Sequence, residues 1–426
     1  MYDDRRDMFY PFSFLRPLSE MRIGMLTMRE RIERAVGLEA QLLLNALHLR
    51  AISEDLVPSC KKSPAFHVNS AHLSLAVPSL FLSSRLIPSG DLGRMVKESA
   101  PAMVFKSGKE IAGFTLPPTT KECEIERLMN PDREYIEYLS GSSIEEVKID
   151  SKLVRNAWEM IEMNESQLAA DFTLLAGEGR DRQRSPPGVV QKGAENIWVS
   201  ARAEISPQAA LDGSSGPIWI AEGVSVLPFS YIEGPAYVGH DTIVNGAIIR
   251  GGTTVGPVCR VGGEVECTIF LGNANKAHGG FLGHSIVGEW VNLGAGTINS
   301  DLKNNYSSVK ITVADKVYDT GMIKMGALIG DHVKTGIGTL INTGAVFGIG
   351  CNLFGGGIQP KFIPDFIWGG AGRYEEYRLE PFLETAAVIM KRRGKTLTQR
   401  LRALFETIFR MSASARLKWL TEMRGV

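Results

Sequence analysis

Two short glycine-containing segments in the second half of the chain combine residue types that could do chemistry. The first runs from Asn275 to Gly283 and contains His278, and the second runs from Val291 to Ile298. An imidazole exchanges a proton near neutral pH or ligates a metal ion. The five cysteines are scattered and form no CxxC pair, so neither a zinc ribbon nor a disulfide framework is expected.

The sequence around both segments repeats with a period of six, and many of the repeating aliphatic residues are followed by glycine. A period of six fits neither an α-helix nor a long strand. It fits a coil of three short strands, each with one inward apolar residue, whose coils stack as a parallel β-helix. The runs of repeating residues are Ile220, Val226, Ile232, Val238 and Val244; then Ile249, Val255 and Val261; then Phe281, Val287 and Leu293; and finally Val317, Ile323, Ile329, Thr335, Ile341, Phe347 and Leu353.

Two stretches interrupt this repeat, residues 266–280 and residues 299–316. Insertions in a solenoid lie on one face and often carry function. His278 lies in the first interruption, which makes that segment the leading candidate for a site.

The composition divides the chain into three parts. Most of the 45 glycines fall between residues 213 and 372, and a polar stretch with two prolines, residues 177–192, is expected to be a linker. We predict a mixed α/β domain over 1–190, the β-helix over 195–360 and a helical tail over 373–426. Helices are expected at 29–47, 158–168, 379–390 and 401–408, and a buried strand at 73–81.

Charge and hydropathy exclude some classes of protein. Lys plus Arg number 47, as do Asp plus Glu, which argues against nucleic-acid or membrane-surface binding through bulk charge. No apolar run reaches the roughly 18 residues of a membrane span. The first ten residues carry mixed charges and no apolar core follows them, unlike a signal peptide. A cytoplasmic protein is expected.

The two segments also carry a resemblance. His278 in a loop that ends in Leu282-Gly283, followed by Asn292-Leu293-Gly294-Ala295-Gly296-Thr297, resembles the acetyltransferase half of the bifunctional sugar-1-phosphate nucleotidylyltransferase/acetyltransferase family. Residues 11–18 and 22–27 resemble a divergent branch with the same architecture. The resemblance implies a Rossmann-like nucleotidyltransferase-type α/β domain followed by a β-helix that is left-handed, an exception to the usual crossover rule.

By this resemblance, His278 is the general base that takes a proton from an amine while acetyl-CoA supplies the acyl group. A backbone N–H of the following coil would stabilise the oxyanion, and Ala295 matches the family position that contacts the co-substrate. Arg250 matches the arginine that meets the sugar phosphate, and Glu264 and Asn292 match further sugar-site positions.

Several positions depart from the family. The lysine that meets phosphate falls at Glu266 or Cys267, the tyrosine of the His loop is Phe281, and an Asn-Tyr pair is replaced by Asp301 and Leu302. A phosphate site that loses a lysine and gains an acid is weakened. The departures therefore predict retained acyl transfer to a different acceptor.

The N-terminal part departs further, because the first 36 residues contain one glycine, Gly24, in place of a glycine-rich phosphate loop. Surface positions are expected for Arg5 and Arg6, whereas Arg16 remains a candidate phosphate contact. Asn164 and Asp171 resemble positions near the end of such domains, where Mg²⁺ would bind if the domain is active. We expect weak nucleotidyl transfer or none.

The leading hypothesis is an acyl-CoA-dependent acyltransferase, N-acetyl transfer being favoured, that acts on a sugar phosphate or nucleotide sugar as a homotrimer in nucleotide-sugar or cell-envelope biosynthesis. One alternative is a non-catalytic nucleotide-sugar-binding scaffold or sensor. The other is a zinc enzyme like the β-helical carbonic anhydrases, which need three histidines that converge across a subunit interface. That alternative would draw on His240, His278, His284 and His332, of which all except His278 occupy ordinary repeat positions.

Overall fold

A computed structural model describes residues 1–40, 43–44, 47–49, 52, 66–68, 72–177, 187–313 and 315–424. The chain divides into two compact units. The first comprises residues 1–9, 13–21 and 26–156, and the second comprises residues 10–12, 22–25 and 157–426. The division falls before residue 157 instead of near 190, so the helix expected at the end of the first domain belongs to the second unit.

The first unit is α/β, as predicted, and its described sheets are mostly antiparallel. In the largest sheet only the pair β10 and β7 is parallel. The strands are β2 (Leu26–Thr27), β3 (Phe66–Val68), β4 (His72–Leu75), β5 (Ser79–Leu82), β6 (Leu86–Ile87), β7 (Met103–Ser107), β8 (Glu110–Leu116), β9 (Thr119–Glu124), β10 (Glu145–Lys148) and β11 (Lys152–Leu153). The helices are α1 (Met28–Val36), α3 (Leu92–Lys97), α4 (Ile125–Met129) and α5 (Arg133–Ser140).

Local chemistry explains two differences from the predicted elements of this unit. Helix α1 begins at a capping box formed by Thr27 and Glu30 and ends at Gly37, whose φ of 71° is left-handed, so it stops well before residue 47. The apolar run from 73 to 81 forms two strands, β4 and β5, instead of one.

Two of the arginines near the N-terminus have different surroundings. Arg5 forms an ion pair with Glu110 at 3.6 Å, and Arg16 is buried.

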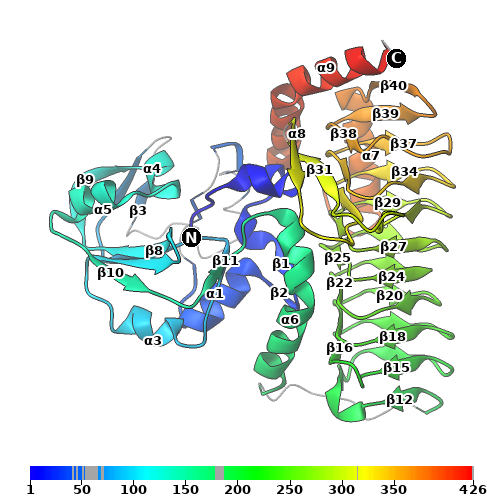
Figure 1. Cartoon of the computed structure of the whole chain (residues 1–426), viewed down its shortest axis with the longest axis horizontal. Coiled ribbons are helices and arrows are strands. Elements are labelled where there is room, and N and C mark those ends of the chain that lie inside the picture. Colours follow the sequence, from blue (N-terminus) through cyan, green and yellow to red (C-terminus); the bar gives the residue numbers. More distant parts are fainter. Residues whose placement is uncertain are drawn as a thin grey trace. The chain divides into compact units, whose positions relative to one another are not determined.

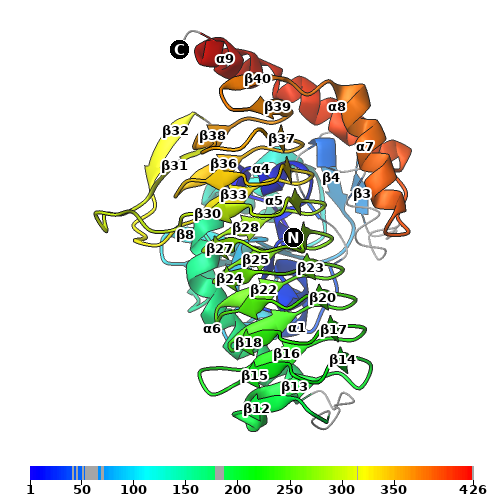
Figure 2. The same ribbon diagram turned by 90° about the vertical axis from the view of Figure 1, so that its right-hand side faces the viewer.

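The second unit contains the left-handed parallel β-helix that the hexads predicted (Figures 1 and 2). One face stacks β12 (Val190–Lys192), β15 (Ala210–Asp212), β18 (Tyr231–Glu233), β21 (Ile248–Ile249), β24 (Glu264–Glu266) and β27 (Phe281–Gly283). A second stacks β13 (Ile197–Val199), β16 (Ile218–Ile220), β19 (Ala236–Val238), β22 (Thr253–Val255), β25 (Ile269–Phe270), β28 (Ile286–Val287), β33 (Ala327–Ile329), β36 (Ala345–Phe347) and β38 (Phe362–Ile363). The third stacks β14 (Glu204–Ile205), β17 (Ser225–Val226), β20 (Ile243–Val244), β23 (Arg260–Val261), β26 (Asn275–Lys276), β29 (Asn292–Leu293), β34 (Lys334–Thr335), β37 (Asn352–Leu353), β39 (Ile367–Gly370) and β40 (Arg373–Glu376).

The hexad phase is correct for most coils and wrong at three positions. The inward residue of β27 is Leu282, which is 1% exposed, and Phe281 is only half-buried. Val317 and Ile323 are 67% and 54% exposed. Val317 lies in the hairpin of β31 (Lys310–Val313) and β32 (Lys316–Asp319), which is inserted in the chain between β30 (Ile298–Asn299) and β33. Strand β30 pairs with β35 (Leu340–Ile341).

The first interruption is not an insertion, because residues 266–280 supply two ordinary strands, β25 and β26. The hexad pattern failed there because the inward residues Val265 and Phe270 follow at intervals shorter than six, and because the inward residue of β26 is Lys276, which is 2% exposed. Its ammonium donates to the carbonyls of Gly262 at 3.1 Å and His278 at 3.0 Å. A buried lysine thus takes an aliphatic position directly before the His278 loop.

Helix α6 (Ala157–Ala176) packs on strands β19 and β22 and holds the turn at residues 22–25, which begins with β1 (Arg22–Ile23). Asn164 accepts from the Gly24 N–H at 2.7 Å and donates to the Gly252 carbonyl at 2.7 Å, and Asp171 accepts from the Met25 N–H at 2.8 Å. Both side chains are buried. They do not fit a Mg²⁺ site, because they already bind this turn.

Three helices follow the β-helix: α7 (Leu379–Lys391), α8 (Gln399–Met411) and α9 (Ala413–Arg424). The first two were predicted, and α9 was missed. Trp419 and Leu420 of α9 join the apolar core of the β-helix, so this helix caps the end of the stack. Helix α7 places its last turn beside the third face of the β-helix, where residues of this turn line a cavity.

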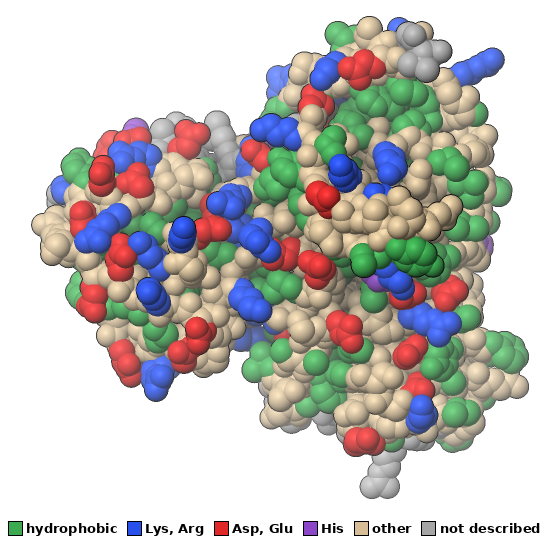
Figure 3. Space-filling model, in the orientation of Figure 1, with side chains coloured by type: hydrophobic (Ala, Val, Ile, Leu, Met, Phe, Trp, Pro, Cys, Tyr) green, Lys and Arg blue, Asp and Glu red, His purple; other side chains and the backbone are tan. Residues whose placement is uncertain are grey.

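The remaining expectations concern the linker and the charge pattern. Most of the predicted linker lies outside the described residues. Among the helices of the described ranges, none has the length and apolarity needed to cross a bilayer. On the face in Figure 3, acidic and basic side chains are interspersed, as the balanced composition predicts.

Candidate active site

A cavity of about 760 Å³ lies on the β-helix beside the His278 loop. Three of the candidate residues, His278, Asn292 and Ala295, line it. The loop carrying His278 connects β26 to β27, and its imidazole is exposed. The structure therefore brings the two motifs of the sequence together at one hollow.

The His278 loop is held at both ends by backbone contacts. The Gly296 N–H donates to the Gly279 carbonyl at 3.0 Å, which ties the loop to the next coil. Gly280 has φ of 126°, and a Cβ there would lie 2.3 Å from the Thr297 carbonyl oxygen. Lys276 binds the His278 carbonyl from inside the coil. The loop is thus a fixed support for an exposed imidazole.

The coil opposite His278 presents its backbone to the cavity. The N–H groups of Gly294 and Gly296 are used within the coils, and among the described residues the Ala295 N–H has no acceptor. The Thr297 and Thr335 hydroxyls share a buried hydrogen bond at 2.7 Å, which fixes this turn. A backbone donor at Ala295 has the character required of an oxyanion contact.

Four basic side chains line the cavity: Arg260, Lys334, Arg392 and Arg393. Among the described residues that form it there is no carboxylate. Arg392 and Arg393 come from the end of α7, and Arg393 donates to the Asn275 side chain at 2.7 Å. Burial, followed by the charge of Arg393, lowers the pKa of Arg260. Like charges that converge in this way form a site for an anion.

Sequence reasoning missed this basic cluster. The charge run of Lys391, Arg392 and Arg393 after the predicted helix over 379–390 is typical of a solvated helix end, but both arginines line the cavity. Burial lowers the pKa of Lys334 to about 7, and its ammonium donates to the His332 carbonyl at 2.9 Å. The only signal in the sequence was the charge run itself.

Arg250 and Glu264 lie apart from the lining residues. The Arg250 Nε donates to Glu264 at 3.1 Å, and a second carboxylate, Glu233, is 3.7 Å from the guanidinium. The hydrogen bond that Arg250 donates to Glu264 raises the pKa of Arg250. Two carboxylates already balance this arginine, so its environment differs from that of a free phosphate ligand.

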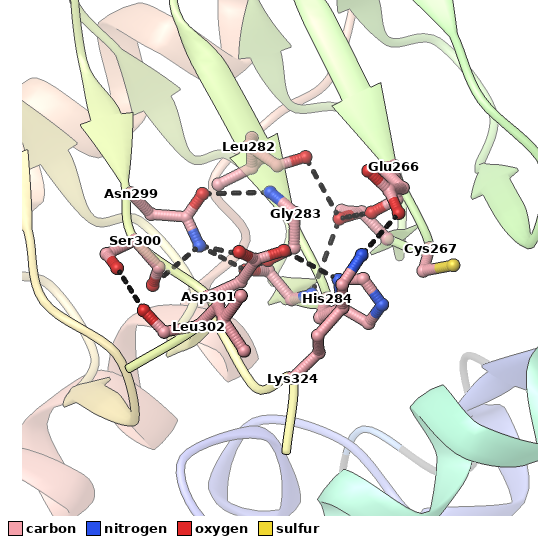
Figure 4. A network of polar contacts seen from close by, with 12 residues as sticks. Glu266, Cys267, Leu282, Gly283, His284, Asn299, Ser300, Asp301, Leu302 and Lys324 are labelled. Carbon is pink, nitrogen blue, oxygen red and sulfur yellow. Dashed lines mark hydrogen bonds and ion pairs between the residues drawn. The ribbon is translucent and has the colours of Figure 1, made fainter. Parts of the chain in front are cut away.

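The histidines of the zinc alternative do not converge within the described chain. His240 pairs with Asp241 at 3.0 Å, and His332 is buried against Trp290, Phe382 and Phe405. His284 lies in an ordinary coil position, at the corner between β27 and β28, as expected. Its Nδ1 lies 2.7 Å from Asp301 in a half-buried polar network (Figure 4).

The buried Lys276 predicts a pH dependence of stability. Burial lowers the pKa of Lys276 to about 8, so between pH 8 and its ordinary pKa of 10.5 the unfolded state binds more protons. The cost of the buried charge is fully present below pH 8 and is relieved as pH rises. Lys276→Met should therefore increase the free energy of unfolding more at pH 7 than at pH 10, by about 3 kcal/mol at most. Urea unfolding of the wild type and Lys276→Met at pH 7 and pH 10 measures these free energies. The same difference between the two proteins at both pH values would contradict the prediction.

The sequence is similar to that of known proteins. Residues 1–180 match the family described as sugar nucleotidyl transferase. The chain is 34% identical over 95 residues to the bifunctional sugar-1-phosphate nucleotidylyltransferase/acetyltransferase of Sulfurisphaera tokodaii, covering 22% of this chain and 24% of that protein. It is 27% identical over 234 residues to the bifunctional protein GlmU of a Nostoc species, covering 50% and 48%. The resemblance drawn from the two motifs is confirmed.

These relatives are named as transferases or as GlmU, and the chain spans about half of their length or less. Among solved structures, the polySia-specific acetyltransferase NeuO is 12% identical, covering 44% of this chain and 81% of that one, with a TM-score of 0.26. The S84T mutant of AntD, an N-acyltransferase from Bacillus cereus in complex with dTDP and Coenzyme A, is 16% identical, covering 50% and 100%, with a TM-score of 0.21.

Proposed function

We propose that this chain is an acyl-CoA-dependent N-acyltransferase that acts on a sugar phosphate or nucleotide sugar. One observation carries the proposal. The cavity beside the exposed His278 is lined by four basic side chains and, within the described residues, by no acid. An acyl-CoA brings several phosphate charges to its site, and arginine forks bind phosphate oxygens in pairs. The apolar side chains of Trp290, Ile337 and Ile389 suit the rest of such a co-substrate.

The proposed chemistry needs one base and one oxyanion donor. The Nε2 or Nδ1 of His278 takes the proton from the acceptor amine as its nitrogen attacks the thioester carbonyl. The Ala295 N–H donates to the oxygen that becomes negative in the tetrahedral intermediate. The carbon–sulfur bond then breaks, and CoA leaves as the thiolate, which gains the proton held by His278. Holding both reactants in one cavity supplies much of the rate.

The charged side chains around Arg250 favour an acceptor that carries an amine. Glu233 and Glu264 surround Arg250, and Glu264 pairs with Phe281, three residues beyond His278. Carboxylates attract the amine of an amino sugar. Arg250 is already paired with both of these carboxylates, so it offers little free positive charge to the phosphate of a sugar phosphate. We infer an acceptor whose amine, more than its phosphate, is recognised here.

The N-terminal domain is proposed to bind a nucleotide sugar and to transfer nucleotides weakly or not at all. The segment that would hold a glycine-rich loop forms short 3-10 turns at Arg6–Phe9, Phe12–Phe14 and Leu18–Glu20. These turns lack the run of glycine amides that cradles a triphosphate. Since acetyl-CoA and nucleotide sugars are made in the cytoplasm, we place the protein there.

The test combines binding with turnover. Acetyl-CoA should raise the melting temperature of the full chain, as a ligand of the folded state must. A panel of amino-sugar phosphates and amino-sugar nucleotides is then assayed for release of free CoA thiol. Turnover of one acceptor supports the proposal. Binding of nucleotide sugars with no turnover of any amine would favour the scaffold alternative, and no effect of acetyl-CoA would exclude an acyltransferase.

We also propose that the protein is a homotrimer. Three aliphatic side chains stack along one edge of the coils, with Ile298 opposite Leu340 and Leu340 opposite Ile358. They are 42%, 38% and 67% exposed. Contiguous exposed aliphatic surface of this kind is typical of an interface. Light scattering should give three times the chain mass, and Leu340→Glu should shift the protein to monomer. A monomeric wild-type protein at micromolar concentration would contradict this.

A further inference from the structure

A second cluster of reactive side chains lies on the β-helix at the corner that follows strands β24 and β27. Glu266 pairs with Gly283 in the ladder, so the next residues, Cys267 and His284, occupy the same position in successive coils. The His284 N–H donates to the Glu266 carbonyl at 3.0 Å, which keeps the two corners in register. A thiol and an imidazole are therefore stacked one coil apart, at strand spacing.

Three ligand atoms meet there, one each from Glu266, Cys267 and His284, all within 4.8 Å of one another. Tetrahedral zinc with ordinary bond lengths needs its ligand atoms about 3.4–3.8 Å apart. Small side-chain rotations suffice to reach that spacing. Neither His278 nor any other residue of the basic cavity takes part, so this cluster is separate from the site proposed above.

Asp301 prepares His284 for such a role. Its carboxylate lies 2.7 Å from Nδ1, and both side chains are 13% exposed. A carboxylate oxygen accepts a hydrogen bond there, so the ring carries its hydrogen on Nδ1 and leaves Nε2 with a free lone pair. In Figure 4 this second ring nitrogen lies on the side of Cys267. A histidine whose other nitrogen donates to a carboxylate is the usual arrangement of a metal ligand.

The segment that supplies Asp301 is itself rigidly attached. Asn299 is buried, and its amide accepts from the Gly283 N–H at 2.8 Å and donates to the Gly283 carbonyl at 2.9 Å. The side chain thus binds both main-chain polar groups of Gly283. Asp301 follows two residues later and meets His284 from the next coil (Figure 4).

We propose that Glu266, Cys267 and His284 form a binding site for a borderline-soft divalent cation, Zn²⁺ before others. Thiolate, imidazole and carboxylate together are a ligand set that zinc accepts, and three protein ligands leave a fourth position open to water or substrate. Glu266 binds through the oxygen that Lys324 does not hold. Asp301 is a positioning residue that acts through His284.

Lys324 is the internal competitor of the metal. Its ammonium lies 3.1 Å from a Glu266 oxygen and neutralises part of the charge that would attract a cation. The Cys267 thiol must also lose its proton, since burial raises its pKa to about 11. A metal ion that binds displaces this proton and takes its place on sulfur. Removing Lys324 should therefore strengthen metal binding.

The experiment uses the full chain freed of metal with a chelator and then titrated with Zn²⁺ or Co²⁺. We expect one ion per chain, and with Co²⁺ a thiolate-to-cobalt charge-transfer band. Cys267→Ser and His284→Ala should lose the band, and Asp301→Asn should weaken affinity by about 10–100-fold. Lys324→Met should tighten it. His240→Ala is the matched control, because His240 also pairs with an aspartate but lies outside the cluster.

Several outcomes would overturn the proposal: no stoichiometric ion, a charge-transfer band that survives Cys267→Ser, or a Lys324→Met protein that binds more weakly than wild type. If Cys267→Ser or His284→Ala fails to fold by circular dichroism, Asp301→Asn and Lys324→Met decide the question, because both leave the coil residues intact. Binding is measured without any acyl acceptor. Failure here is therefore distinguishable from failure of the proposed acyltransferase.

Discussion

Replacing His278 by alanine is expected to lower the turnover number for acetyl transfer by a factor of about 10²–10⁴, the usual effect of removing a general base. Stability should hardly change, because the imidazole is exposed on a loop that backbone contacts hold in place. Rates are measured by release of CoA thiol at saturating acceptor, and melting by circular dichroism. The KM for acetyl-CoA should change much less than the turnover number.

The control for this variant is His240→Ala, which removes an exposed imidazole from another corner of the same β-helix. His284 is unsuitable as a control, because it bonds Asp301 and belongs to the candidate metal cluster. If the wild type, His278→Ala and His240→Ala were equally active, another group would have to take the proton. Equal loss in both variants would point to a general defect of the fold.

The double variant Arg392→Ala/Arg393→Ala is expected to raise the KM for acetyl-CoA by roughly 10²-fold, since two charge-assisted contacts to phosphate are lost at about 1.5 kcal/mol each. The turnover number at saturating acetyl-CoA should stay within a few-fold of wild type, because neither arginine touches the reacting carbonyl in the proposal. Steady-state kinetics over a range of acetyl-CoA concentrations, at low and high salt, measures both quantities.

Lys391→Ala is the matched control for the arginines. It removes one positive charge from the same helix end, but Lys391 does not line the cavity. A control variant with the same rise in KM would mean that bulk charge, not the cavity, attracts the co-substrate. An unchanged KM in the double variant would remove the basis for placing acyl-CoA in this cavity.

The β-helix was predictable because each coil depends on residues close in the sequence. Val226, Ile232 and Val238 turn inward at intervals of six, and every inward residue contacts its equivalents one coil away. The pattern failed at Lys276, since a charged residue in an aliphatic position hides the repeat. It also failed at Val317, where an exposed hairpin happens to continue the spacing.

The motifs around His278 and Ala295 were likewise visible as local segments, and stacking of adjacent coils was enough to bring them to one cavity. Arg393 and Asn275 are hydrogen-bonded although 118 residues separate them, and no local pattern records that contact. His284 and Asp301, by contrast, lie one coil apart, at the spacing that pairs Glu264 with Phe281, so the stacking of adjacent coils brings them together. The repeat and the Cys–His corner depend on contacts between adjacent coils, whereas the basic cluster arises where side chains far apart in the sequence meet, and that was decided by the tertiary structure.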